Sequence, residues 1–140
     1  MHIVVAVKQV VDYRVKVRVA QDQLTLPTSN LKQSMNPFDA IAVEEAIRLK
    51  ESGVATSITA VSISKGSNSQ ILKQCLAMGV CNATNITVSS DVRSSLKIAK
   101  ILQAYCAKVS PDLVLLGKQA IDSDASQTGP MLAALLNWPQ

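Results

Sequence analysis

The residues best suited to binding chemistry lie in one segment, Gly117 to Thr128. An apolar run, Leu113 to Leu116, leads directly into it, and Gly117 lets the backbone approach a ligand closely. The stretch 126–129 (SQTG) stands at the expected start of a helix, where free N–H groups and the helix dipole favour an anion. Chemistry alone leaves two interpretations equally open: a phosphate-binding loop, or a polar loop followed by a capped helix.

Other reactive residue types do not form a catalytic constellation. No GxGxxG follows the first apolar run, and no GxxxxGK[ST] occurs anywhere. Asp122 and Asp124 lack a companion base, which favours a structural role in the loop. The single histidine, His2, is better placed on an edge strand than as a base or a ligand. We therefore predict no catalytic residue and no metal site.

The elements that must position this loop alternate between strand and helix. Asn36 is a good N-cap for a helix with Pro37 in its first turn and Gly53 beyond its end. Ser67 and Gln70 pair as a capping box for the next helix. The remaining elements are strands expected at 2–7, 56–64, 83–88 and 113–116, a helix opened by Asp91, and a final helix containing 131–136.

Four strand–helix units predict a single α/β domain over residues 1–140. We expect an open, doubly wound, mainly parallel sheet with helices on both faces. Aromatic residues make up only 3% of the chain, so Val, Ile, Leu and Ala must build the core. Ligands on such sheets bind beyond the carboxyl ends of the strands near the topological switch point. The ends of the first, second and fourth strands are therefore the places to inspect.

An insertion, Gln9 to Met35, separates the first strand from the first helix. Its runs Val15 to Val19 and Leu24 to Leu26 are typical of a hairpin standing off the sheet. Arg14, Lys16 and Arg18 alternate with valines, which places cations on one strand face and valines on the other. We interpret this as the solvated face of a half-buried strand, because no aromatic is interleaved to stack a nucleic-acid base. No nucleic-acid partner is expected.

Four segments together resemble the β-subunits of electron transfer flavoproteins. They are VAVKQVVDYRVKVRV (5–19), SMNPFDAIAVEEAIRLKE (34–51), LAMG (76–79) and DLVLLGKQAIDSDASQTG (112–129). The resemblance implies an electron carrier and not an enzyme: a β-subunit paired with an α-subunit. That pair takes electrons from acyl-CoA and related dehydrogenases, as in fatty acid oxidation, to a membrane quinone oxidoreductase. It also implies that FAD is held mainly by the α-subunit and that the β-subunit buries a structural AMP.

The resemblance assigns site residues as well. Tyr13 matches the tyrosine that approaches the flavin ring. Three positions depart from the family pattern: Ile63 stands where a small or sulfur side chain is frequent, Ser126 replaces a common Asn, and Pro130 sits just inside the final helix. The AMP contacts that the resemblance implies are Ala6, Asn36, Pro37, Phe38, Asp39, Ile63, Gly117, Lys118, Gln119, Ala120, Ile121, Asp122, Ser123, Asp124, Ala125, Ser126, Gln127 and Thr128.

Two other function classes fit an α/β sheet: a nucleotide hydrolase or adenylating enzyme, and a nucleotide-sensing module. The glycine-spaced phosphate motifs that they need, after the first and the fourth strand respectively, are missing. Three cysteines without close CxxC spacing, no signal peptide and no membrane-spanning apolar run predict a cytoplasmic protein without membrane insertion. Because family members continue past Gln140, we also expect the chain to lack their C-terminal portion and to self-associate through an uncovered sheet edge.

Overall fold

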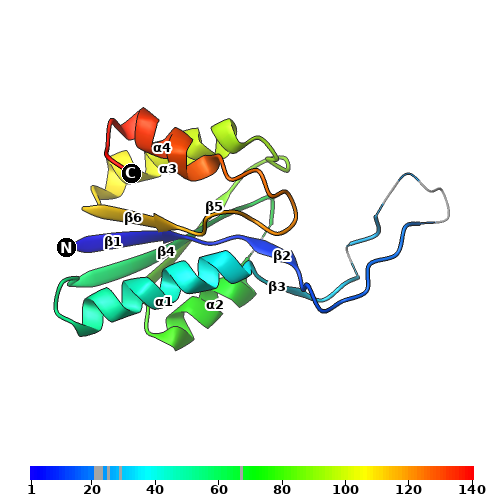
Figure 1. Cartoon of the computed structure of the whole chain (residues 1–140), viewed down its shortest axis with the longest axis horizontal. Coiled ribbons are helices and arrows are strands. Elements are labelled where there is room, and N and C mark those ends of the chain that lie inside the picture. The colour runs from blue at the N-terminus through cyan, green and yellow to red at the C-terminus, as the bar shows by residue number, and fades with distance from the viewer. Residues whose placement is uncertain (21–23, 25, 29, 67) are drawn as a thin grey trace.

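The computed structural model describes residues 1–20, 24, 26–28, 30–66 and 68–140. Its centre is a four-stranded sheet whose strands pair in parallel and follow the order β5-β4-β1-β6 (Figure 1). The strands are β1 (His2–Ala6), β4 (Ser57–Ser64), β5 (Asn82–Thr87) and β6 (Leu113–Leu116). The predicted α/β class and the positions of all four strands are confirmed.

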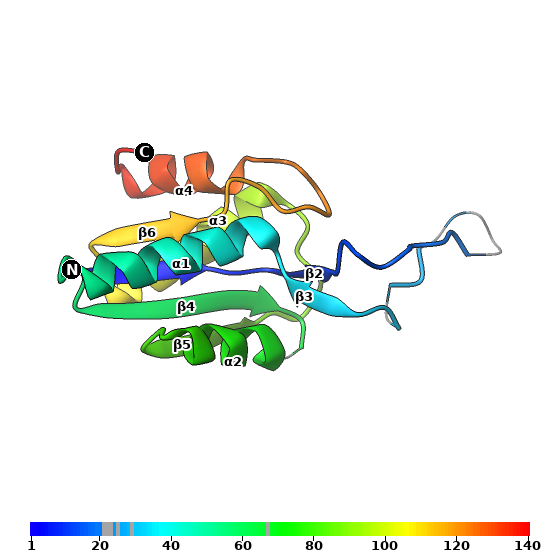
Figure 2. The same ribbon diagram turned by 60° about the horizontal axis from the view of Figure 1, so that its bottom comes forward.

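Helices cover both faces of the sheet. Helices α1 (Pro37–Glu51) and α2 (Ser69–Met78) lie on one face, and α3 (Ser95–Val109) and α4 (Thr128–Leu136) lie on the other (Figures 1 and 2). Alternate residues of β1 divide between the two layers: Ile3 and Val5 pack in the cluster of Val43, whereas Val4 packs in that of Leu102. The chain builds outward from β1 to β4 and β5 and then returns to β6 on the other side of β1. The switch point therefore lies between β1 and β6.

The predicted ends of the helices are largely correct. Helix α1 begins at Pro37 and is followed by Gly53 at φ 78°, and α2 is closed by Gly79 at φ 117°. The predicted capping box falls partly on Ser67, which lies outside the described residues. The prediction that Asp91 opens a helix was wrong. Helix α3 begins at Ser95, because the Ser94 side chain caps it by accepting a hydrogen bond from the Lys97 amide at 3.4 Å.

The insertion projects from the carboxyl end of the sheet as an arm (Figures 1 and 2). Its strands were predicted at the wrong place. The antiparallel pair is the stem, β2 (Gln9–Val11) with β3 (Gln33–Met35), and residues 15–19 form no strand. The two strands of the stem pair because Val10 and Met35 are buried against the rest of the domain, whereas Val17 and Val19 are 43% and 60% exposed. The described part of the second predicted run, Leu24 and Leu26, is also exposed.

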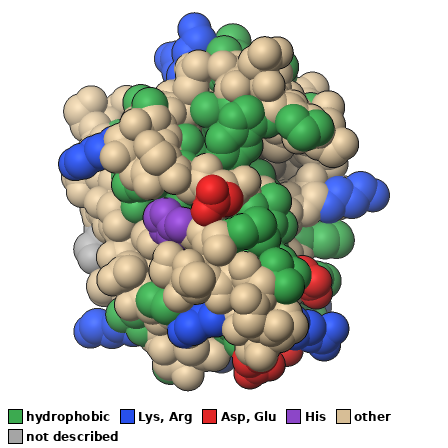
Figure 3. All heavy atoms as spheres, turned by 90° about the vertical axis from the view of Figure 1, so that its left-hand side faces the viewer, with side chains coloured by type: hydrophobic (Ala, Val, Ile, Leu, Met, Phe, Trp, Pro, Cys, Tyr) green, Lys and Arg blue, Asp and Glu red, His purple; other side chains and the backbone are tan. Residues whose placement is uncertain are grey.

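The amino ends of the strands carry no gathering of charge. Figure 3 shows acidic and basic side chains scattered over this face, with the histidine beside an acidic group. His2 begins the interior strand β1, not an edge strand, because β1 pairs with β4 on one side and with β6 on the other. Its backbone N–H donates to the Asp112 carboxylate, and its ring contacts the Thr59 hydroxyl at 3.0 Å. The sheet edges are β5 and β6. No helix in the described ranges is long and apolar enough to cross a membrane.

Candidate functional site

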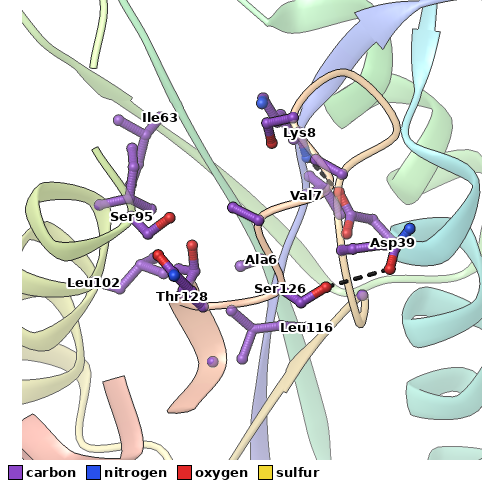
Figure 4. Close-up of a pocket in the computed structure, with 18 of the residues that line it drawn as sticks. Ala6, Val7, Lys8, Asp39, Ile63, Ser95, Leu102, Leu116, Ser126 and Thr128 are labelled. Carbon is purple, nitrogen blue, oxygen red and sulfur yellow. Dashed lines mark hydrogen bonds between the residues drawn. The ribbon is translucent and has the colours of Figure 1, made fainter. Parts of the chain in front are cut away.

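A cavity opens at the carboxyl ends of β1, β4 and β6, where the switch point of the sheet lies (Figure 4). Its volume is about 170 Å³, more than ten times the roughly 15 Å³ that one water molecule needs. It is therefore large enough for an organic ligand. Its walls are the strand ends, the loop 117–127 after β6, and the starts of α3 and α4.

The two sides of the cavity differ in their side chains. Figure 4 shows the apolar Ile63 and Leu102 on one side, with the hydroxyl residues Ser95 and Thr128 beside them, and the charged Lys8 and Asp39 on the other. Ala6 and Leu116, at the ends of neighbouring strands, lie between them. A ligand with an apolar planar part and an anionic part suits this division.

Gly117 allows the loop to leave β6 against the first turn of α1. A Cβ atom at this position would lie 2.7 Å from the backbone nitrogen of Asp39 and 2.7 Å from the carbonyl carbon of Phe38, and it would overlap the Asp39 carboxylate. Backbone atoms cannot yield as a flexible side chain can, so only glycine fits. The sequence pattern pointed to a close approach at Gly117, and the structure shows that the partner is α1.

Asp39 is the buried acid of the site, with 7% of its surface exposed. Its carboxylate accepts a hydrogen bond from the Lys8 backbone N–H at 2.8 Å. Burial raises the pKa of Asp39 from about 3.8 to about 6, while hydrogen bonds from its neighbours, the Lys8 and Gly117 amides among them, oppose that rise. Asp39 therefore ties the ends of β1 and β6 to the start of α1.

Asn36 holds the middle of the loop. Its side chain is fully buried, donates to the Gln119 carbonyl at 2.8 Å and accepts from the Ile121 N–H at 3.2 Å. Asn36 occupies the N-cap position of α1 as predicted, but its side chain makes no capping hydrogen bond. The amide is instead used to bind the backbone of a loop more than 80 residues away.

Further contacts shape the loop. Gln119 donates to the Asp124 carboxylate at 2.8 Å and accepts from the Ser126 hydroxyl at 3.2 Å. Asp124 and Ser126 adopt left-handed backbone conformations, with φ of 47° and 53°. Lys8 pairs with Asp122 at 2.7 Å on the exposed side of the loop. The loop is thus fixed at several points along its length.

The loop delivers the chain to the start of α4 at the cavity. Gln127 is the N-cap but makes no side-chain capping bond. Within the described part of the chain, the backbone N–H groups of Thr128 and Gly129 have no hydrogen-bond partner, and Pro130 has no N–H to satisfy. Two free amides at the positive end of a helix dipole favour an anion here.

The cavity brings together part of the predicted nucleotide set. Tyr13 is elsewhere: it lies at the base of the arm, 71% exposed, with the Arg14 guanidinium 5.7 Å from its ring centre. Asn36, Pro37, Phe38, Ile121, Asp122 and Asp124 do not line the cavity. The predicted residues that do are Ala6, Asp39, Ile63, Gly117, Lys118, Gln119, Ala120, Ser123, Ala125, Ser126, Gln127 and Thr128.

Sequence reasoning missed the wall formed by α3 and the segment before it. The residues at or just after strand ends, among them Val7, Lys8 and Leu116, could have been found by the rule that ligands bind beyond the carboxyl ends of strands. Gly129 lies in the stretch 126–129 already singled out. The residues of α3 and of the segment before it had no local signal, because only the return of the chain to β6 brings α3 across the switch point. The lining residues not predicted are Val7, Lys8, Val61, Val92, Arg93, Ser95, Ile98, Leu102, Leu116 and Gly129.

The described residues contain no group of three His, Cys, Asp or Glu side chains placed to hold a metal ion. Within the same ranges Cys75, Cys81 and Cys106 are free thiols. The lining of the cavity also offers the charged side chains of Lys8, Asp39, Arg93 and Lys118.

A parallel sheet wound by helices on both faces, with a cavity at its switch point, defines a Rossmann-like α/β domain. The chain belongs to the electron transfer flavoprotein family, because its residues 23–140 match the model described as the electron transfer flavoprotein domain.

Named proteins of that family can be aligned with the whole chain. It is 51% identical to the mitochondrial electron transfer flavoprotein subunit beta of rice (Oryza sativa subsp. japonica) over 143 residues, 100% of this chain and 56% of the relative. It is 46% identical to electron transfer flavoprotein subunit beta of Dictyostelium discoideum and 43% identical to that of Homo sapiens, again over 100% of this chain and 56% of each relative. The chain thus spans about half the length of the curated relatives it matches.

Proposed function

We propose that this chain is the AMP-binding β-type subunit of a two-subunit, FAD-containing electron carrier. The carrier would accept electrons from acyl-CoA and related dehydrogenases and pass them to a quinone oxidoreductase. The observation that carries the nucleotide assignment is the pair of free amides, Thr128 and Gly129, at the mouth of an apolar cavity on the switch point of the sheet. Family membership and the names of the relatives support the electron-transfer role.

The residues present fit an adenine nucleotide. Ala6, Ile63 and Leu102 offer an apolar surface to the base, and the start of α4 offers amides to the phosphate. The hydroxyl of Thr128 adds a donor beside those amides, whereas that of Ser126 already donates to Gln119. AMP in this place is structural: it fills the switch point and pins loop 117–127, and no bond is made or broken.

FAD belongs mainly to the proposed α-subunit and supplies the capacity to take up and release electrons. Tyr13 is the residue of this chain that we assign to the flavin. Its ring is 71% exposed and stands outside the nucleotide cavity, which leaves it free to meet a partner subunit. We propose no catalytic residue in the chain itself. The relative from rice is named as mitochondrial, so a cytoplasmic location stays a prediction.

The nucleotide site is tested by Thr128→Glu, with Thr128→Gln as the matched control. Both variants carry a longer side chain, but only glutamate places a negative charge at the phosphate position. We expect Thr128→Gln to retain AMP at a reduced level and Thr128→Glu to retain none, measured by chromatography of the nucleotide released on denaturation. Equal AMP content in the two variants would rule out a phosphate at the start of α4.

A further inference from the structure

A second, larger hollow adjoins the nucleotide cavity. Its volume is about 810 Å³, and it lies between the stem of the arm and the carboxyl ends of β4 and β5, where Val10, Gln33, Lys65 and Val88 line it. The two hollows share one wall, because the same residues line both: Lys8, Ile63, Val92, Arg93, Ile98 and Ser123.

Ile63 is the strand residue in the apolar half of this shared wall. It is the penultimate residue of β4 and packs, partly buried, against the core layer under α3 and α4. Val92 and Ile98, from the segment before α3 and from α3 itself, complete the apolar half. Figure 4 shows Ile63 on the same side of the nucleotide cavity as Ser95, Leu102 and Thr128.

We propose that Ile63 determines which nucleotides the cavity accepts, by closing the base end of the site against the second hollow. The inference rests on the proposed function, since it takes the base to lie on the apolar wall and the phosphate at α4. A purine then fits with its outer edge against the Ile63 side chain. A base with a bulky substituent on that edge is excluded, although empty space lies immediately behind the side chain.

The proposal follows from how closely packed walls discriminate between ligands. A methylene or two in a hydrophobic pocket changes binding by about tenfold or more. Shortening Ile63 to alanine removes the part of the wall between the hollows and leaves the α4 amides and the loop intact. The base substituent would then enter the second hollow, while the phosphate keeps its contacts.

Ile86 provides the control. It is the same residue type, lies opposite Ile63 in the register of β4 and β5, and packs in the same core layer, but it lines neither hollow. Ile86→Ala therefore reproduces the loss of core volume on this face without opening the wall. The probes are AMP and AMP carrying a benzyl group on its N6 amino nitrogen, with dissociation constants measured by calorimetry on nucleotide-free protein.

We expect Ile63→Ala to shift the preference toward the benzylated nucleotide by at least about tenfold relative to wild type, and Ile86→Ala to leave it unchanged. Ile63→Val, a milder change that spares the fold, should shift it in the same direction by less. Unchanged preference in both Ile63 variants, with AMP still bound, would overturn this inference alone. Failure of the wild-type protein to bind AMP would overturn the proposed function, and this inference with it.

Discussion

The side-chain amide of Asn36 donates a hydrogen bond to the carbonyl oxygen of Gln119 at 2.8 Å, joining the start of α1 to the middle of the loop after β6. The same side chain accepts from the Ile121 N–H at 3.2 Å. One fully buried amide thus satisfies a donor and an acceptor of a loop that belongs to no sheet. The shape of the nucleotide cavity depends on this contact, because Gln119 lines it.

Replacing Asn36 should loosen the loop. Asn36→Ala leaves a partly buried carbonyl and a partly buried N–H without their partner, which we expect to lower the free energy of unfolding by about 2 kcal/mol. Urea denaturation measures that loss, and the nucleotide dissociation rate should rise as well. Val43→Ala removes packing under α1 without touching the loop and serves as the control. If the two variants release nucleotide equally fast at equal stability, Asn36 does not position the loop.

Gly117 should not tolerate a side chain. Gly117→Ala forces a Cβ into the backbone of α1 at Asp39, and we expect it to cost about 2 kcal/mol of folding stability and to abolish nucleotide retention. Gly66→Ala is the matched control, since a Cβ at Gly66 meets no atom within 4 Å. Thermal denaturation compares the two variants. A Gly117→Ala protein as stable as Gly66→Ala would show that α1 does not press against the loop.

Much of this arrangement was predictable from local patterns, and the rest was not. The start of α1 and the bounds of β6 follow from capping residues and from a short apolar run, which depend on neighbours in the sequence. The use of Asn36 by a loop 83 residues away does not, because capping chemistry and loop binding need the same side chain. The strands of the arm were predicted at the wrong place for a related reason. The alternation at 15–19 predicts a strand, but a strand needs a partner strand. Burial of Val10 and Met35 places the pairing at the stem instead.

Asp39 should make stability depend on pH between about 4 and 6. The folded protein holds the carboxyl proton more tightly than the unfolded chain, because burial raises the pKa to about 6. The contribution of Asp39 is therefore largest below pH 4 and is lost as the pH rises through 6, by roughly 3 kcal/mol.

Asp39→Asn has no proton to lose. The unfolding free energy of wild type, relative to that of Asp39→Asn, should fall as the pH rises from 4 to 6 and stay level above 7. Urea titrations at several pH values give this difference directly. A constant difference over that range would mean that Asp39 titrates in the folded protein as it does in the unfolded chain.

Asp12 should hold the base of the arm. Its carboxylate is 1% exposed and pairs with the Arg14 guanidinium at 2.7 Å and with Lys32 at 3.7 Å. The Arg14 hydrogen bonds hold the pKa of Asp12 well below its usual range, so the carboxylate stays charged at neutral pH. Asp12→Asn weakens both pairs, and we expect trypsin to cleave after Lys16 faster than in wild type.

Glu51→Gln is the control for Asp12→Asn. Glu51 is exposed, and its replacement removes one negative charge at the end of α1 that lies away from the arm (Figure 1). Mass spectrometry of the first tryptic fragments identifies the cleaved bond. Equal cleavage rates in wild type, Asp12→Asn and Glu51→Gln would show that the buried carboxylate does not restrain the arm.

We propose that the cavity at the switch point holds a mononucleotide and that the flavin belongs to a partner. Mass spectrometry and absorbance of the small molecules released from the denatured chain, purified without exogenous nucleotide, test it most directly. We expect one AMP per chain and a colourless protein without flavin absorbance. A stoichiometric flavin, or protein that carries no AMP and does not bind it when it is added, would overturn this assignment.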